Sequence, residues 1–273
     1  TTSGGSERLT TMAWDVRDLQ GKQARIEIVD ARRGGWGHIN VDHIVMTDTR
    51  GTIPLAPVAV PMRYDVTKEF LLKQRFLHLP VRTGAKSRHV KLIVDGSEIK
   101  RMDVELADEQ AEWWAPVELN DFQGKMVTVR VDALPSDSKA LNLIQQSDAW
   151  IENEPVYQED LRSRFHFSPK RGWTNDPNGL VAYQGEYHLF FQHNPYGWNW
   201  GNMHWGHATS TNLVDWKEHG DVLEPDSLGA MFSGSAVVDW NNTSGLGESG
   251  KPPLVLIYTA AGNPTTQCIA SSL

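Results

Sequence analysis

The chain has very little cysteine: Cys268 is the only one among 273 residues, so no disulfide can form within it. Its apolar neighbours in residues 267–270 predict a buried, unreactive thiol. Long hydrophobic runs are lacking too, because no stretch reaches the ~18 apolar residues of a membrane-spanning helix. Residues 1–6 show neither a starting methionine nor the pattern of a signal peptide.

Positive charge is in deficit as well. Lysine and arginine number 26 against 34 aspartates and glutamates, which gives a formal net charge of −8. Domains that bind nucleic acid usually carry a basic face, because they must neutralise phosphates. The charge therefore argues against a nucleic acid partner and favours a neutral or polar ligand.

What the chain does have is a globular composition and short strand patterns. Hydrophobic residues make up 40% of the chain, and its length suggests two or three domains. Residues 24–29 alternate like a strand, and residues 39–46 predict another. Two or three strands cannot close a core. Residues 1–50 are therefore predicted to form an incomplete β-sandwich-like accessory segment, and the chain is expected to be processed or a piece of a longer protein.

This first segment holds one candidate sugar-contacting patch, formed by Trp36, His38, Asn40 and Asp42. The alternative is that the three polar residues share a face only because strand side chains repeat every two residues. In that case the tryptophan belongs to a core.

A proline-rich link leads into residues 53–150, which are predicted to form a second β-sandwich-like accessory module. Strands are expected near residues 70–81, 89–94, 99–106 and 125–131. The turn sequence of residues 18–22 recurs almost unchanged at residues 121–125, which indicates either two related modules or only a shared turn followed by a strand. Trp113 and Trp114 are adjacent, so on a strand at most one of them is free to stack on a sugar.

Loop signals place the next boundary between Asp148 and Leu161. Beyond it the chain consists of short predicted strands, namely residues 180–183, 187–193, 203–210, 216–223, 231–239, 254–260 and 267–273. Four strands in about fifty residues are typical of one blade of a β-propeller. The predicted fold class is therefore all-β, with sandwich-like modules first and propeller-like sheets after them.

Residues 165–179 are the stretch in which we expect chemistry, and Asp176 is its centre. Proline crowds the residue before it, so Pro177 holds Asp176 away from the α region. Residues 177–179 then supply a sharp turn. Asp176 is predicted to be extended, at a rigid corner. The alternative is a surface turn with no chemistry.

Further motifs accompany this stretch in a characteristic order: Trp173-Thr174, Phe191-Gln192-His193-Asn194-Pro195, Trp200-Gly201, His204-Trp205-Gly206-His207-Ala208 and Phe232-Ser233-Gly234-Ser235. Together they resemble glycoside hydrolase family 32, the fructan-cleaving invertases, inulinases and levanases. The likeness runs from about residue 162 to the end of the chain, while residues 1–160 match this site nowhere.

The resemblance implies that residues 162–273 form a partial catalytic β-propeller, the first two blades of a five-bladed ring. By motif match, Asp176 is the nucleophile that captures an oxocarbenium-like transition state in a retaining mechanism. The matching residues expected to line a fructose pocket are Asn175, Gln192, Trp200, Phe232 and Ser233. The resemblance implies fructan or sucrose as substrate, with levan favoured, no cofactor, and a location outside the cell, in the periplasm or at the cell surface.

The second carboxyl is the difficulty. In the family the acid/base glutamate lies in a Glu-Cys motif and another aspartate in an Arg-Asp-Pro motif, and this chain contains neither. Glu224 and Asp226 are predicted to lie in a loop and Asp239 at the end of a strand, so none of them is assigned this role. We expect a piece of a β-fructosidase that is inactive by itself, and the alternative is a catalytically inactive fructan-binding protein.

Six of the ten histidines lie between residues 166 and 219, which invites a metal hypothesis. Strand geometry weakens it, because His204 and His207 are three residues apart and so point to opposite faces. No carboxylate or thiol lies beside them at ligand spacing. The histidines are therefore predicted to be structural or sugar-facing, with no metal.

Overall fold

The computed structural model describes residues 13–29, 41, 44–46, 60–151, 156–248 and 250–272. The chain separates into two compact units, residues 1–60 and residues 61–273. Residues 13–29 contain one short 3-10 helix, Arg17–Leu19, and no strand. The strand predicted at residues 24–29 is thus wrong, and Ile26 and Ile28 are about half exposed. The proposed patch of Trp36, His38, Asn40 and Asp42 lies outside the described residues.

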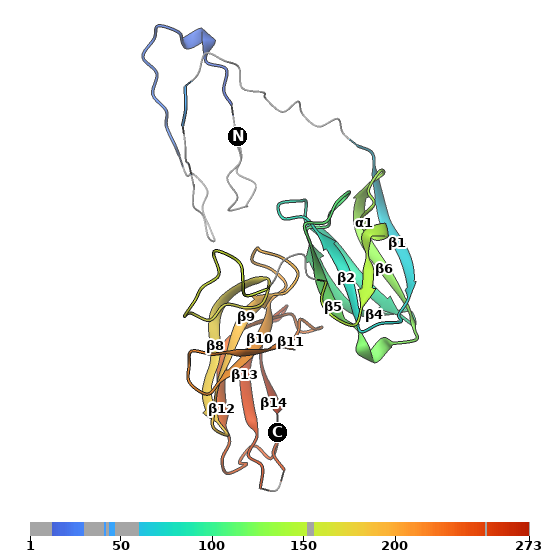
Figure 1. The fold of residues 1–273 in the computed structure, drawn as a ribbon, viewed down its shortest axis with the longest axis vertical. Helices are drawn as coiled ribbons and strands as arrows, with labels where there is room; N and C mark the ends of the chain where they lie inside the picture. Colours follow the sequence, from blue (N-terminus) through green and yellow to red (C-terminus); the bar gives the residue numbers. More distant parts are fainter. Residues whose placement is uncertain are drawn as a thin grey trace. The chain divides into compact units, whose positions relative to one another are not determined.

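The second unit begins with a β-sandwich (Figure 1). One antiparallel sheet has the order β1 (Met62–Leu71), β6 (Met126–Pro135), β3 (Arg88–Val94) and β4 (Ser97–Val104). The other has the order β5 (Trp113–Glu118), β2 (Phe76–Val81) and β7 (Gln145–Ser147), and a short helix, α1 (Ala140–Leu143), precedes β7.

Alternation along the strands builds the core of this sandwich. Every second residue of β3 is buried, as period-two side chains require when one face of a sheet is covered. Fully buried side chains from both sheets, among them Leu79, Leu92 and Val129, belong to one hydrophobic cluster. Each such side chain stabilises the fold by about 1.5–3 kcal/mol, so the two sheets form one module.

The strand predictions for this module are largely confirmed, with one error. The predicted strands near residues 89–94, 99–106 and 125–131 are β3, β4 and β6. The single strand predicted at residues 70–81 is wrong, because β1 ends at Leu71 and β2 starts at Phe76. Side chains stabilise the break: Gln146 accepts a hydrogen bond from Lys73 N at 2.8 Å, and Asp148 accepts one from Arg75 N at 3.0 Å.

The repeated turn sequence folds the same way at both places. Residues 120–122 form a 3-10 helix like that of residues 17–19. Lys22 N donates to Leu19 O at 2.9 Å, and Lys125 N donates to Phe122 O at 3.0 Å. Only the second copy leads into a strand, β6, since residues 23–29 form none. The shared feature is therefore the turn.

Two antiparallel meanders follow. The first has β8 (Trp173–Tyr183), β9 (Glu186–Asn194), β10 (His204–Ser210) and β11 (Lys217–Leu223) side by side in chain order. The second has β12 (Ala230–Val238), β13 (Leu254–Ala261) and β14 (Thr266–Ser272). These seven strands confirm the predicted ones, except that β8 begins earlier, at Trp173.

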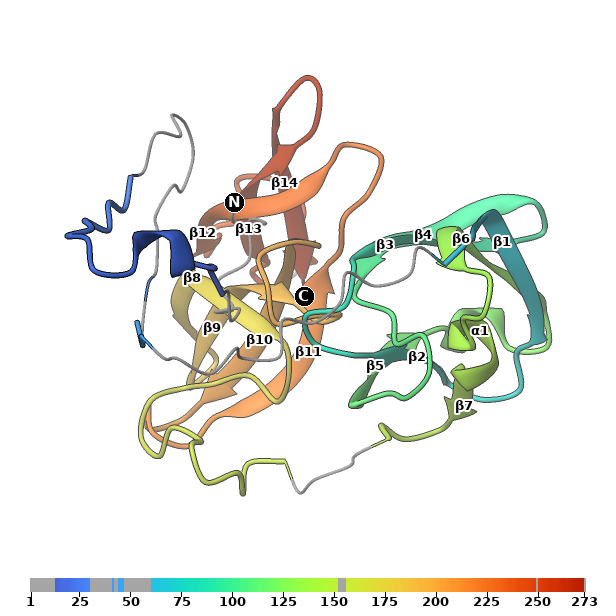
Figure 2. The ribbon, with the colours of Figure 1, turned by 90° about the horizontal axis from the view of Figure 1, so that it is seen from above.

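The two meanders pack on each other in the manner of successive propeller blades. Phe190 and Trp205 of the first share a buried cluster with Met231, Leu256 and Tyr258 of the second. The leading strands β8 and β12 lie side by side, as Figures 1 and 2 both show. Successive blades of a propeller meet in this way, and the structure confirms the predicted all-β fold with an incomplete propeller.

Coverage of the blades is uneven. In the first blade Leu189 and Phe191 are buried, because Phe167 and Trp216 pack against them. In the second blade Ile257 and Ile269 remain 43% and 60% exposed. Cys268, which precedes Ile269 in β14, is only half-buried, so the prediction of a buried thiol is wrong.

Candidate active site

Asp176 lies at a β-bulge near the start of β8. Thr174 pairs with His193 and Pro177 pairs with Phe191, so Asn175 and Asp176 together stand opposite the single residue Gln192. An extra residue bends a strand and re-aims its side chains, and bulges are common beside active sites. Pro177 is tolerated here because β8 is an edge strand of its sheet.

The sharp turn predicted at residues 177–179 is not formed. Residues 177–179 continue β8 instead of ending it in a turn, and a second bulge lies between Asn178 and Val181. Gly179 occupies the left-handed region there, with φ of 52°, which glycine adopts without strain. The bend expected from a turn is produced by two bulges in one strand.

Ser233 sits at a matching bulge in β12. Phe232 pairs with Thr259 and Gly234 with Tyr258, which leaves Ser233 as the extra residue. Its Oγ donates a hydrogen bond to Asp176 Oδ2 at 2.7 Å, a length typical of an O–H···O hydrogen bond. The two bulges thus bring together two of the residues predicted for the site.

Buried side chains of the first blade hold β12 in this register. Gln192 is 4% exposed, and its Nε2 donates to Met231 O at 2.8 Å. Trp205 is fully buried, and its Nε1 donates to Phe232 O at 3.2 Å. The two carbonyls immediately before Ser233 are therefore fixed. Gln192 thus fixes the backbone of β12 beside the site. Its predicted contact with a sugar hydroxyl stays a prediction.

Asn178 is a contributor that the sequence reasoning missed. It is 1% exposed, and its Oδ1 accepts a hydrogen bond from Gly234 N at 3.4 Å, one residue beyond Ser233. The sequence reasoning treated it only as a turn former. A signal was present, because residues 176 and 178 share a face in a strand, and that pattern could have placed both beside β12.

Two aromatic rings expose apolar surface at the same end of the blades. Trp200 is 65% and Phe232 36% exposed, and their rings meet edge to face with centroids 6.2 Å apart. Such rings suit the apolar face of a sugar. Phe232 precedes Ser233 directly, and the exposed Asn175 precedes Asp176. Of the five predicted binding residues, Asn175, Trp200 and Phe232 are thus exposed, Ser233 is half-buried and Gln192 is buried.

A buried ion pair stabilises the entry into β8. His193 Nδ1 contacts Asp221 Oδ1 at 2.6 Å, and its Nε2 lies 2.8 Å from Arg171 O. Both partners are acceptors, so both ring nitrogens carry protons and the imidazole is charged. Burial opposes that charge, yet attraction to Asp221 and the hydrogen bonds together raise the pKa of His193. Burial likewise opposes the carboxylate, and His193 lowers the pKa of Asp221.

The other carboxylates considered from the sequence have structural partners. Glu224 forms an ion pair with Lys100. Asp226 accepts a hydrogen bond from Leu228 N at 2.7 Å, within a turn. Neither carboxylate has a contact with Asp176 among the described interactions.

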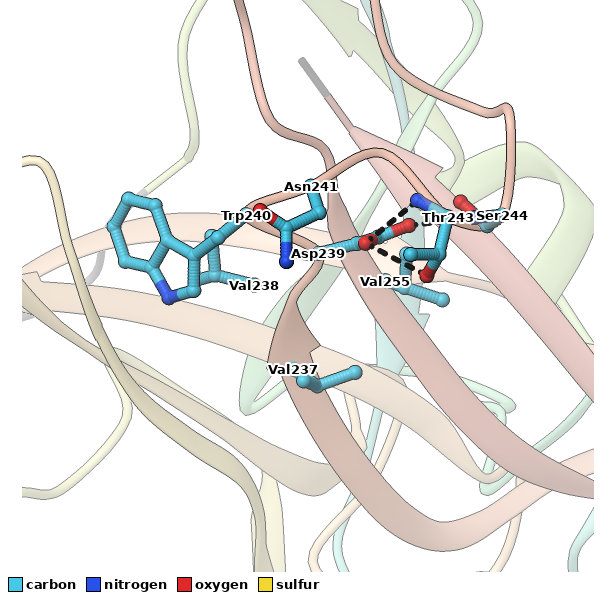
Figure 3. A pocket seen from close by; sticks show the side chains of 8 residues that line it. All are labelled: Val237, Val238, Asp239, Trp240, Asn241, Thr243, Ser244 and Val255. Carbon is cyan, nitrogen blue, oxygen red and sulfur yellow. Dashed lines mark hydrogen bonds between the residues drawn. The ribbon is translucent and has the colours of Figure 1, made fainter.

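Asp239 belongs to a separate hollow of about 370 Å³, drawn in Figure 3. Its carboxylate accepts hydrogen bonds from Ser244 N and from Thr243 N and Oγ1. These bonds, those from the Ser244 and Thr243 backbone foremost, lower the pKa of Asp239 to about 2. Asp239 lies six positions beyond Ser233, just after the end of β12, a separation of roughly 20 Å at ~3.3 Å per residue. Asp239 therefore closes a turn and lies away from the site.

Histidine side chains serve packing in the first blade. His204 packs against Tyr196, with ring centroids 5.5 Å apart, whereas His207 stacks on Phe190 at 4.4 Å. They face opposite sides of β10, as predicted. Burial and then the neighbouring His188 lower the pKa of His207 to about 4. Among the described residues no three histidine, cysteine or acidic side chains are grouped as metal ligands.

Residues 166–273 match the family model described as the glycosyl hydrolases family 32 N-terminal domain. This part of the chain, called the family 32 segment below, is similar to that domain. It contains every residue of the site described above. Residues 66–170, which include all but the first residues of the sandwich, match a model described only as "Domain of unknown function (DUF4980)".

Curated relatives match the family 32 segment. A protein named levanase from Bacillus subtilis is 58% identical over 103 residues, which cover 38% of this chain and 15% of that protein. A fructan beta-fructosidase from Streptococcus mutans is 54% identical over 113 residues, covering 41% and 8%. The chain thus spans less than a fifth of the length of these relatives.

Among solved structures, exo-inulinase from Aspergillus awamori aligns with a TM-score of 0.40 and 45% identity, over 43% of this chain and 26% of that one. Within the described residues, no helix is long and apolar enough to cross a membrane.

Proposed function

We propose that this chain belongs to a retaining glycoside hydrolase that cleaves β-fructofuranosidic bonds in fructans or sucrose. The observation that carries the proposal is the hydrogen bond between Ser233 and Asp176, formed where two strand bulges meet in the family 32 segment. An exposed carboxylate, oriented by a neighbour and flanked by exposed aromatic rings, is suited to attack a sugar carbon.

In this mechanism Asp176 is the nucleophile. The Ser233 hydroxyl holds one carboxylate oxygen and orients the other toward the anomeric carbon, where positive charge develops as the glycosidic bond breaks. A fructosyl-enzyme ester results, and water then releases fructose. Trp200 and Phe232 cover the apolar face of the ring.

The leaving oxygen needs a proton, and a retaining enzyme places its acid about 5–5.5 Å from the nucleophile. The acidic side chains weighed for this role, Glu224, Asp226 and Asp239, are committed to an ion pair and to turns. We therefore assign the acid to residues outside this chain, so the chain alone supplies half of the catalytic pair.

Levan is the substrate we favour among fructans, because the levanase of Bacillus subtilis is 58% identical over the matched residues. Relatives named extracellular exo-inulinase support a location outside the cell.

The test is an Asp176→Asn variant of the complete gene product, assayed for fructose release from sucrose, inulin and levan. The amide keeps the shape of the carboxylate and loses its nucleophilicity, so kcat should fall about 10³-fold or more while fructan binding persists. Asp239→Asn is the matched control and should retain activity. Near-normal turnover by Asp176→Asn would show that another carboxylate attacks. Absent turnover in the parent, with fructan still bound, would favour an inactive binding protein.

A further inference from the structure

The loop that joins β9 to β10, residues 195–203, carries Trp200 and is hydrogen-bonded to the sandwich through Asn202. Its Oδ1 accepts a hydrogen bond from Asp103 N at 2.8 Å, and its Nδ2 donates to Asp103 O at 2.8 Å. The side-chain amide thus pairs with both backbone groups of one residue in β4, as a neighbouring strand would.

The same amide reaches back into the first blade. Asn202 Nδ2 also donates to Asn194 Oδ1 at 3.0 Å, and Asn194 Nδ2 donates to Asn199 O at 2.8 Å. Asn202 adopts a φ of 44°, a left-handed conformation that asparagine tolerates better than most side chains. One residue therefore ties the end of the loop to the sandwich and to the end of β9.

Aromatic packing anchors the middle of the loop to the sandwich. Tyr196 is 5% exposed and belongs to the hydrophobic cluster of the sandwich core. Trp198 meets Trp113 edge to face, with centroids 5.6 Å apart. Asn199 Nδ2 donates to Glu105 Oε1 at 3.0 Å. Each of these contacts crosses from the loop to a residue of the sandwich.

The loop also contacts β8, the strand that carries Asp176. Trp173 N, at the first residue of β8, donates to Gly197 O at 3.0 Å. Asp176 lies three residues farther along that strand, and Trp200 meets Phe232 across the site. A continuous set of contacts therefore runs from β4 of the sandwich through the loop to both sides of the candidate site.

We propose that the sandwich is a positioning support for the fructoside-binding site, acting through Asn202 to hold Trp200 against the sugar. The proposal rests on the proposed function, and it makes Asn202 a positioning residue. The tryptophans of the sandwich favour this role over separate carbohydrate binding. Trp113 is 5% exposed, and Trp114 is half-buried, with its Nε1 3.5 Å from Leu143 O.

The first experiment measures loop order by hydrogen exchange and needs no activity. In the full chain, Asn202→Gly should accelerate amide exchange in residues 195–203 by about tenfold or more, because the hydrogen bonds between the Asn202 side chain and Asp103 are lost. Glycine keeps the left-handed backbone accessible. Asn242→Gly is the matched control, since Asn242 has a φ of 50° and also bonds through its side chain, to Gly247. It should leave residues 195–203 unchanged.

The second experiment links the loop to substrate. In the complete gene product, Asn202→Gly should raise the KM for levan and the Kd for a fructooligosaccharide about tenfold, with kcat within about threefold. In a Trp200→Ala background the same substitution should change neither constant, because its effect passes through Trp200. Asn202→Asp, which keeps the acceptor and loses the donors, provides a second variant if the glycine variant folds poorly.

Unchanged exchange in residues 195–203 would overturn the proposal, and so would an effect on affinity that persists without Trp200. Failure of the proposed function looks different, since Asp176→Asn would then stay active while the exchange result still held.

Discussion

At the scale of single residues, the contact between Ser233 and Asp176 makes a direct prediction. Ser233→Ala in the complete gene product should lower kcat/KM about 10- to 100-fold, because a hydrogen bond to a charged group is worth about 1.5–3 kcal/mol. Ser235→Ala, two residues along the same strand, is the control and should change little. Initial rates of fructose release measure both. Equal rates for the two variants would mean that Ser233 does not orient the nucleophile.

The sequence proposes which residues form the candidate site, but it does not predict how they are arranged. Motif order identified Asp176 and Ser233, and the structure joins them by a hydrogen bond. The bulges that produce this contact depend on how each strand pairs with its neighbour, which a local pattern does not contain. For the same reason the buried position of Gln192 was not foreseen, because it faces Met231 on another sheet.

At the scale of elements, the ion pair of His193 and Asp221 ties β9 to β11 and makes stability depend on pH. The folded-state pKa of His193 is raised above 6.5, so its contribution is complete below about pH 6.5 and is lost as pH rises through the raised value. The pKa of Asp221 is lowered below 3.8, so its contribution is lost only as pH falls through the lowered value. The pair should stabilise the fold most between about pH 4 and 6.5.

Asp221→Asn should therefore reduce the free energy of unfolding by about 3 kcal/mol at pH 5.5, and by less at pH 9, because the charged pair weakens as pH rises through the raised pKa of His193. Urea unfolding of the 273-residue chain, followed by tryptophan fluorescence, measures the difference. Asp239→Asn serves as control, because Asp239 is ionised at both pH values. A loss from Asp221→Asn that is the same at pH 5.5 and pH 9 would contradict the charged pair.

Strand patterns were predicted well where partners lie nearby in the chain. All seven blade strands were expected, because each pairs with its neighbour in sequence. The sandwich was harder: β1 pairs with β6 across more than fifty residues, and β1 itself was merged with β2. Residues 24–29 have the alternating pattern of a strand but form none in the described part of the first unit. Alternation predicts a strand only when a partner is available.

At the scale of the whole molecule, we expect the 273-residue chain alone to release no fructose. General acid catalysis is worth about 10² to 10⁴ in rate, and the chain offers no assigned acid. The exposed Ile257 and Ile269 on the second blade add an apolar face, which favours association. The assay is incubation of purified residues 1–273 with sucrose, inulin and levan. Clear turnover that disappears in Asp176→Asn would contradict an acid outside the chain.

The central claim, that Asp176 forms a covalent bond to fructose, is tested most directly by trapping the intermediate. The complete gene product would be mixed with levan, quenched in acid within the first turnovers, digested, and examined by mass spectrometry. We predict a fructosyl adduct on the peptide that contains Asp176, absent in Asp176→Asn and present in Asp239→Asn. An adduct on another carboxylate, or active enzyme that never carries an adduct, would contradict the account.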